Sequence, residues 1–239
     1  MSSSFPIPEN LVVELERIYL LYAGLLCDNR EHSLGGHLLY AGEPDERGAQ
    51  MLRAANIAGA ASLAVSADAG SLRHLMREGA IDFTVNSLDE ALRILKNEIR
   101  KQQPVAVGVS TAAETLLAEM LERGVLPDLL APNMVEDRTL TEFAAQGARW
   151  VQPATLPEGV RPHVFSIPEA WRQQTAAFDA MLMNCLGEED QVNRRWLRLA
   201  ARYLPSSARR LRSVACDDRT AAQLLALVKE QPKSLTGAE

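Results

Sequence analysis

Cysteine and long apolar runs are scarce in this 239-residue sequence. The three cysteines, Cys27, Cys185 and Cys216, lie far apart and form no CxxC pair, so we expect a reducing compartment and no disulfide framework. No apolar run reaches the roughly 18 residues that cross a bilayer. The opening MSSSFPIPEN lacks the basic and apolar regions of a secretory signal. We therefore expect a cytoplasmic protein that contacts no membrane.

Histidine is also rare, and the charge balance is acidic. The four histidines, His32, His37, His74 and His163, show no metal-ligand spacing, so no metal site is predicted. The formal net charge of −6 argues against non-specific binding of nucleic acid. Within this acidic chain, residues 194–212 hold many arginines and no acidic residue. That stretch is typical of a solvated helix face, and an anion site or a subunit contact are the alternatives.

Short apolar segments alternate with amphipathic helical segments along most of the chain. The predicted strands are residues 37–41, 61–66, 82–85, 105–109, 128–131 and 149–152. Ser/Thr-x-x-Glu capping boxes predict four helix starts, at Ser87/Glu90, Thr111/Glu114, Thr139/Glu142 and Ser166/Glu169. The alternation is typical of right-handed βαβ crossovers. It predicts an α/β fold, a Rossmann-like doubly wound parallel sheet with helical additions at both ends.

The additions define the expected domain organisation. An apolar-faced helix precedes Gly35, and prolines interrupt the chain after Pro153. Two helices, at about 169–186 and 188–204, are then followed by a strand at 211–216 and a helix at 220–229. We predict an N-terminal helix (1–34), a Rossmann-like domain (35–155), a mainly helical region that packs on the sheet (156–231) and a disordered tail (232–239).

Four pieces of the central segment carry a family resemblance: GGHLLYAGEPDERGAQ, AANIAGAASLAVSAD, NSLDEALRILKNEIRK and AAETLLAEMLERGVLPDLLAP. In order, spacing and hydrophobic rhythm, residues 35–132 resemble the dinucleotide-binding domain of urocanase (urocanate hydratase). The resemblance implies a Rossmann-like fold and NAD as a cofactor. It implies cofactor contacts at Gly42 and Gly48 of the first turn, and at Ser66 and Asp68 near the position of the ribose-binding acid.

The first turn departs from the family pattern. Urocanases have a glycine-rich A-G-L-G-G-M-G-G-A-Q turn, through which backbone amides approach the pyrophosphate. This chain has AGEPDERGAQ, in which Pro44 has no amide to donate and Glu43, Asp45 and Glu46 are acidic. Each carboxylate would repel a diphosphate by about 1 kcal/mol even at near-bulk dielectric. The cofactor is therefore unknown: the family implies NAD and the turn disfavours it.

The same acids have two further interpretations. They cap the following helix, whose N-terminus favours negative charge, or they bind a cationic or hydroxyl-rich ligand. A ligand cleft is expected at the carboxyl ends of the strands. Its predicted residues are Glu43, Asp45, Glu46, Ser110, Pro132 and Asn133.

No catalytic residue is assigned. The histidine that follows the fifth strand in urocanases is absent from this sequence, and so is the region that supplies the family's catalytic tyrosine, cysteine, arginine and aspartate. Urocanate hydration is not expected. Three functions remain open: a non-catalytic or re-purposed urocanase-like domain that binds a small molecule, an enzyme with a nucleotide-type cofactor in an altered pose, and an oligomeric structural or regulatory protein.

Overall fold

The protein forms two compact units. The computed structural model describes residues 7–27, 32–131 and 138–229. The first unit, called the sheet unit, contains Glu16–Thr155 and Tyr203–Ser206. The second unit, called the hairpin unit, contains Met1–Leu15, Leu156–Arg202 and Ser207–Glu239.

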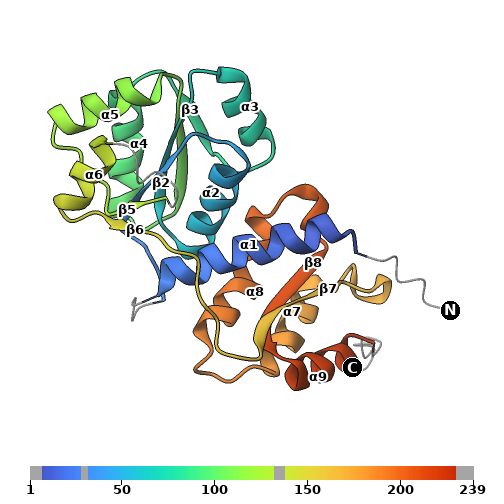
Figure 1. The fold of residues 1–239 in the computed structure, drawn as a ribbon. Helices are drawn as coiled ribbons and strands as arrows, with labels where there is room; N and C mark the ends of the chain where they lie inside the picture. The colour runs from blue at the N-terminus through green and yellow to red at the C-terminus, as the bar shows by residue number, and fades with distance from the viewer. Residues whose placement is uncertain (1–6, 28–31, 132–137, 230–239) are drawn as a thin grey trace. The chain divides into compact units, whose positions relative to one another are not determined.

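A six-stranded parallel sheet forms the centre of the sheet unit (Figure 1). Its strands are β1 (Leu38–Gly42), β2 (Ala61–Val65), β3 (Phe83–Val85), β4 (Val105–Val109), β5 (Leu129–Leu130) and β6 (Arg149–Trp150). They lie in the order β3-β4-β2-β1-β5-β6, and every neighbouring pair is parallel. All residues of β1, β2 and β4 are buried, as expected for central parallel strands that are covered on both faces. The predicted Rossmann-like sheet is confirmed.

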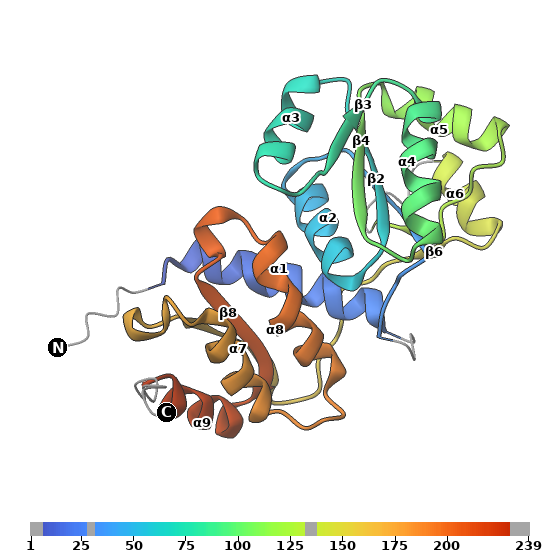
Figure 2. The same cartoon turned by 180° about the vertical axis from the view of Figure 1, so that it is seen from behind.

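Helices cover both faces of this sheet. They are α2 (Glu46–Ala58), α3 (Ala69–Arg77), α4 (Leu88–Arg100), α5 (Ala113–Glu122) and α6 (Arg138–Ala145). The division between the two units falls within a further helix, α1 (Glu9–Leu26), whose residues from Glu16 belong to the sheet unit. Helices α4, α5 and α6 lie on one side of the sheet, and α2 and α3 lie on the other (Figures 1 and 2). The main core cluster joins Leu92, Met120 and Phe143 of α4, α5 and α6 to strand residues such as Leu63 and Val107.

The direction of the chain through the sheet reverses beside β1. From β1 the chain proceeds to β2, β3 and β4, which all lie on one side of it. It then crosses to β5 on the opposite side. The carboxyl ends of β1 and β5 therefore form the topological switch point of the sheet, where open α/β sheets bind their ligands.

Two aspartates tie neighbouring strands together at their amino ends. The Asp128 carboxylate, just before β5, accepts a hydrogen bond from the Leu38 amide of β1 at 2.7 Å. The Asp82 carboxylate, just before β3, accepts one from the Ala106 amide of β4 at 2.8 Å. Each bond joins strands that are distant in the sequence, so it helps to set their register.

One of the predicted helix starts in the sheet unit is confirmed, since Ser87 is the N-cap of α4. The Ser87 hydroxyl accepts a hydrogen bond from the Glu90 amide at 3.3 Å, although the Glu90 carboxylate binds the Asn86 amide rather than that of Ser87. The Thr111/Glu114 box is wrong, because Ala112 is the N-cap of α5 and forms no side-chain cap. The Thr139/Glu142 box is also wrong, because α6 begins at Arg138 and Thr139 lies inside its first turn.

The hairpin unit is built on two antiparallel strands, β7 (Val160–Ser166) and β8 (Leu211–Asp217). Its helices are η1 (Glu169–Trp171, a 3-10 helix), α7 (Thr175–Asn184), α8 (Gln191–Tyr203), η2 (Ser206–Ala208, a 3-10 helix) and α9 (Asp218–Val228), with the end of α8 and the start of η2 grouped with the sheet unit. Phe165, Trp171, Phe178, Leu182 and Leu197 form much of its core.

The predicted helix at 169–186 is wrong, because η1 and α7 are separate. The N-cap of η1 is Pro168 rather than Ser166, and its backbone is extended. The Trp171 amide closes a tight turn on the Pro168 carbonyl at 2.9 Å. This turn buries the Trp171 ring against Phe178, with ring centroids 5.7 Å apart, and the chain re-enters a helix at Thr175.

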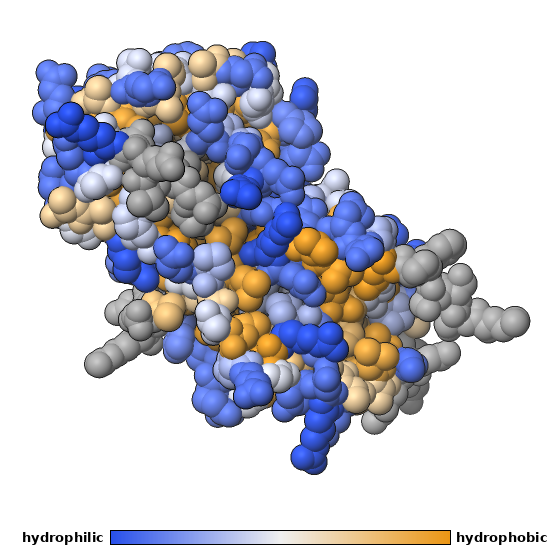
Figure 3. Space-filling view, in the orientation of Figure 1, coloured by the Kyte–Doolittle hydropathy of each residue, from blue (hydrophilic) through white to orange (hydrophobic). Residues whose placement is uncertain are grey.

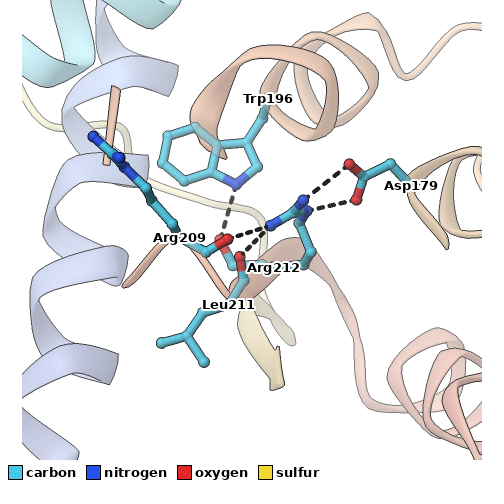
Figure 4. Close-up of polar contacts among 6 residues, drawn as sticks. Asp179, Trp196, Arg209, Leu211 and Arg212 are labelled. Carbon is cyan, nitrogen blue, oxygen red and sulfur yellow. Dashed lines mark hydrogen bonds and ion pairs between the residues drawn. The ribbon is translucent and has the colours of Figure 1, made fainter. Parts of the chain in front are cut away.

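A buried ion pair accounts for one residue of the arginine-rich stretch (Figure 4). The Arg212 guanidinium binds both carboxylate oxygens of Asp179 and donates to the backbone carbonyls of Arg209 and Leu211. Beside it, the Trp196 indole donates to the Ser213 hydroxyl at 2.9 Å. Arg212 is 6% exposed, so its charge is neutralised within the unit and is not presented to a partner.

Hydrophilic residues predominate on the face of the sheet unit that is drawn in Figure 3. Its apolar side chains are gathered instead in the core between the sheet and the helices. Among the helices of the described residues, none is both long enough and apolar enough to cross a bilayer.

We predict that the Asp128→Ala substitution lowers the free energy of unfolding by about 1 kcal/mol, because the Leu38 amide loses a charged acceptor. Asp128→Asn is the matched control, since its side-chain carbonyl can still accept that bond. Urea denaturation followed by circular dichroism measures both variants. Equal destabilisation by Ala and Asn would contradict the assigned role of the hydrogen bond.

Candidate functional site

A pocket of about 720 Å³ opens at the switch point of the sheet. Tyr40, Ala41 and Gly42 at the end of β1 line it, together with Ala131 directly after β5. The residues of the pocket that the structure describes all belong to the sheet unit. The candidate site therefore occupies the place where the topology of the sheet predicts a ligand.

The pocket has an apolar interior and a polar rim. Its large apolar side chains are Leu20, Leu21, Tyr40, Met51, Leu117 and Leu140. Its polar side chains are Arg17, Glu43, Asp45, Arg47, Gln50 and Gln152. A concave apolar site with a few polar groups is the usual form of a small-molecule site.

The turn between β1 and α2 is closed on itself. Gly42 has a φ of +73°, a left-handed conformation that favours glycine. A Cβ atom on Gly48 would lie 2.2 Å from the Glu43 carbonyl oxygen. The backbone of the turn thus fills the space beside Gly48, and the small residue is required by the turn itself.

Asp45 is the N-cap of α2. Its carboxylate accepts a hydrogen bond from the Gly48 amide at 2.7 Å, and its backbone is extended, as an N-cap requires. The helix N-terminus, which attracts anions, is therefore already supplied with a negative group by the chain. The capping interpretation of the acidic turn is confirmed for Asp45.

Glu46 connects α1 and α2 through contacts with two residues that line the pocket. Its carboxylate lies 3.5 Å from the Arg17 guanidinium and accepts a hydrogen bond from the Gln50 side-chain amide at 3.3 Å. Arg17 and Glu46 are well exposed, so their ion pair adds little stability. Gln50 is different, because it is 4% exposed and lines the pocket.

The other predicted cofactor contacts lie at neighbouring strand ends. Ser66 and Asp68 follow β2. Neither is among the described residues that line the pocket. Asp68 is the N-cap of α3, and hydrogen bonds from the Ser71 hydroxyl and the Gly70 and Ser71 amides lower the pKa of its carboxyl group. The Ser66 hydroxyl accepts a hydrogen bond from the Asp68 amide at 3.2 Å. These groups support the turn that opens α3.

The remaining predicted cleft residues follow β4 and β5. The Ser110 amide donates to the Val85 carbonyl at 2.8 Å, and Ser110 lies outside the lining described above. Pro132 and Asn133 lie outside the described residues. Of the predicted site residues, the structure brings Gly42, Gly48, Glu43 and Asp45 together at the pocket, with Glu46 adjacent.

Sequence reasoning missed the wall that α1 contributes. Arg17, Leu20 and Leu21 of α1 line the pocket, together with Gln152 and Pro153 after β6. The Ala154 amide donates to the Leu20 carbonyl at 2.8 Å, which joins the segment after β6 to α1.

A glycine in α1 was the available signal for this contact. A Cβ atom on Gly24 would lie 1.9 Å from the Gln152 carbonyl oxygen. Glycine inside an apolar helical pattern often marks the close approach of another backbone segment.

Cys216 is the buried cysteine of the hairpin unit. Burial, and then the negative charges of Asp217, Asp190 and Asp218, raise the pKa of its thiol to about 11. It therefore packs in the core as a neutral thiol and is a poor nucleophile at neutral pH. Among the described residues, no group of three or more histidine, cysteine, aspartate or glutamate residues is arranged to hold a metal ion.

The parallel sheet, the helices on both faces and the pocket at the switch point define a Rossmann-like domain. The sequence model of the urocanase Rossmann-like domain matches residues 24–148. That segment is more than half of the chain, and the chain belongs to this family.

We predict that Asp45→Ala lowers the free energy of unfolding by about 1 kcal/mol, because the Gly48 amide loses its cap. Asp45→Asn serves as the control: asparagine is an equally good N-cap, so its stability stays close to that of the unmodified protein. Thermal and urea unfolding report the difference. An Asn variant as unstable as the Ala variant would show that charge rather than capping matters.

We also predict a steep pH dependence for the alkylation of Cys216. Because the thiol pKa is about 11, the thiolate fraction and the rate rise about tenfold per pH unit from about pH 8 to about pH 10. Iodoacetamide labelling followed by peptide mass spectrometry measures this rate. A rate that levels off below pH 9 would contradict the raised pKa.

Proposed function

We propose that this protein is a re-purposed, non-catalytic member of the urocanase Rossmann-like family. In this proposal the pocket at the switch point binds a small molecule, and the turn between β1 and α2 no longer holds the pyrophosphate of NAD. The fold is retained from the family, whereas the ligand differs.

The observation that carries the proposal is the hydrogen bond between the Asp45 carboxylate and the Gly48 amide, at 2.7 Å. In a dinucleotide-binding turn, such first-turn amides point at the phosphates. To receive a diphosphate in that pose, the turn would have to release Asp45 and place Glu43 and Asp45 beside a second anion. Both the lost cap and the charge repulsion oppose this binding.

The source of the pocket walls supports a changed ligand. Arg17, Leu20, Leu21, Gln152 and Pro153 line the pocket, and all five lie outside residues 24–148, which match the family. These residues narrow the space beside β1 and add apolar surface to it. A site that combines family and additional elements is expected to select a ligand of its own.

The main alternative is an enzyme with a nucleotide-type cofactor in an altered pose. The observation that favours it is the presence of Arg17 and Arg47 in the lining, because guanidinium groups bind phosphate well. Glu46 already pairs with Arg17, which weakens this case. Mass spectrometry of the denatured protein would support the alternative if it released a stoichiometric nucleotide.

We predict that NAD titrated into the purified protein gives no binding isotherm in the micromolar range. The physical reason is the occupied N-terminus of α2 and the carboxylates around it. Isothermal titration calorimetry at low and at physiological salt is the measurement, since screening would mask a weak electrostatic interaction. A micromolar dissociation constant, or NAD that remains bound through purification, would overturn the proposal.

A further inference from the structure

Resting on the proposed function, we infer that the pocket takes a neutral, largely apolar molecule that carries a hydrogen-bond donor, and that Gln50 recognises this donor. The inference names the class of ligand and the residue that selects it. Three features of the sheet unit carry it: the orientation of Gln50, the apolar interior and the charges of the rim.

Gln50 offers an acceptor to the pocket. Its Nε2 donates to a carboxylate oxygen of Glu46 at 3.3 Å, and its Oε1 accepts no hydrogen bond from a described residue. If the Gln50 amide were reversed, its Oε1 would lie against the Glu46 carboxylate oxygen and the two would repel. Glu46 therefore fixes Nε2 as the atom that it binds. The side chain is 4% exposed and lines the pocket. Because Nε2 is committed to Glu46, Oε1 is the end of the amide with which a ligand N–H or O–H group can pair.

Arg17 reinforces this orientation. Its guanidinium lies 3.5 Å from the same Glu46 oxygen that Gln50 binds, and it thereby holds the carboxylate over the amide. Arg17, Glu46 and Gln50 thus form a short polar chain from α1 to the pocket. Because the negative Glu46 carboxylate binds the N–H end of the Gln50 amide, Gln50 offers its carbonyl oxygen to the ligand rather than an N–H group.

The interior favours an apolar ligand body. Leu20, Leu21 and Met51 come from α1 and α2, while Leu117 and Leu140 come from α5 and α6. A volume of about 720 Å³ lies within the range of pockets that enclose small organic molecules. Burial of a ring against this surface supplies affinity, and Gln50 supplies selectivity.

The charges of the rim disfavour a polyanion. Glu43 and Asp45 line the pocket with Arg17 and Arg47, and Glu46 lies beside Gln50, so these five groups carry one more negative than positive charge. Three of these five charges are already committed, since Arg17 pairs with Glu46 and Asp45 caps α2. Within the described lining, a nucleotide phosphate would find Arg47 as the remaining guanidinium and would also meet the Glu43 carboxylate.

Matched pairs of neutral aromatic probes test the inference. Phenol, indole and benzamide carry a donor, whereas anisole, N-methylindole and N,N-dimethylbenzamide are their methylated counterparts without one. We expect saturation-transfer NMR titrations to show the donor-bearing member of each pair binding about five- to tenfold more tightly. AMP and ADP-ribose, titrated in the same way, should bind more weakly than any donor-bearing probe.

Two substitutions locate the effect in the pocket. Gln50→Met removes the acceptor at similar volume and should abolish the difference between paired probes, whereas Gln146→Met, at an exposed residue after α6, should preserve it. Ala113→Phe fills the pocket and should abolish probe binding altogether. Ala118→Phe is its control, because Ala118 is exposed on the same helix α5.

The outcomes separate this inference from the proposed function. If no probe binds, or if Ala113→Phe changes nothing, the pocket is not a small-molecule site and both proposals fail. If probes bind in the pocket but each methylated member binds as tightly as its partner, the role of Gln50 is wrong and the proposed function survives. Tighter binding of AMP or ADP-ribose would overturn the ligand class.

Discussion

The position of β1 between β2 and β5 is the constraint on which the rest of the sheet unit depends. Parallel pairing on both sides buries every residue of β1 and places its carboxyl end at the switch point. The Asp128 carboxylate holds the amino end of the strand through the Leu38 amide. The pocket opens beside Gly42 at the carboxyl end of the strand, and the turn after β1 lines it together with residues of α1, α2, α5 and α6.

Asp45 supplies the helix after β1 with a cap from the chain itself. In a dinucleotide-binding domain the phosphates of the ligand satisfy the first-turn amides of the helix. In this chain a side chain supplies the negative group, so α2 is complete without a ligand. The fold depends on the strands and on helix packing, while the affinity for a cofactor depends on the turn. In the proposed function, a change of turn alters the ligand and leaves the architecture intact.

The sequence predicted the sheet well because its signals are local. Central strands such as β2 and β4 are short, continuous apolar runs, and helices with a strong apolar face alternate with them. The capping boxes were less reliable: the Thr111 amide binds the Val109 carbonyl in the turn that leaves β4, and α5 begins later, with Ala112 as its N-cap. Long-range contacts gave little signal. The α1 wall of the pocket and the Asp179–Arg212 pair join residues that no spacing rule connects.

The exposed pair between Arg17 and Glu46 shows why contribution to stability and contribution to specificity must be judged separately. At the surface such a pair adds little to the free energy of folding. Yet Glu46 also accepts a hydrogen bond from the Gln50 Nε2, and in the inferred role this leaves Oε1 for the ligand. A buried acceptor discriminates among ligands because the wrong ligand leaves it unpaired. In the proposed role, a weak surface contact therefore sets the selectivity of the site, while the apolar walls determine how tightly a ligand is held.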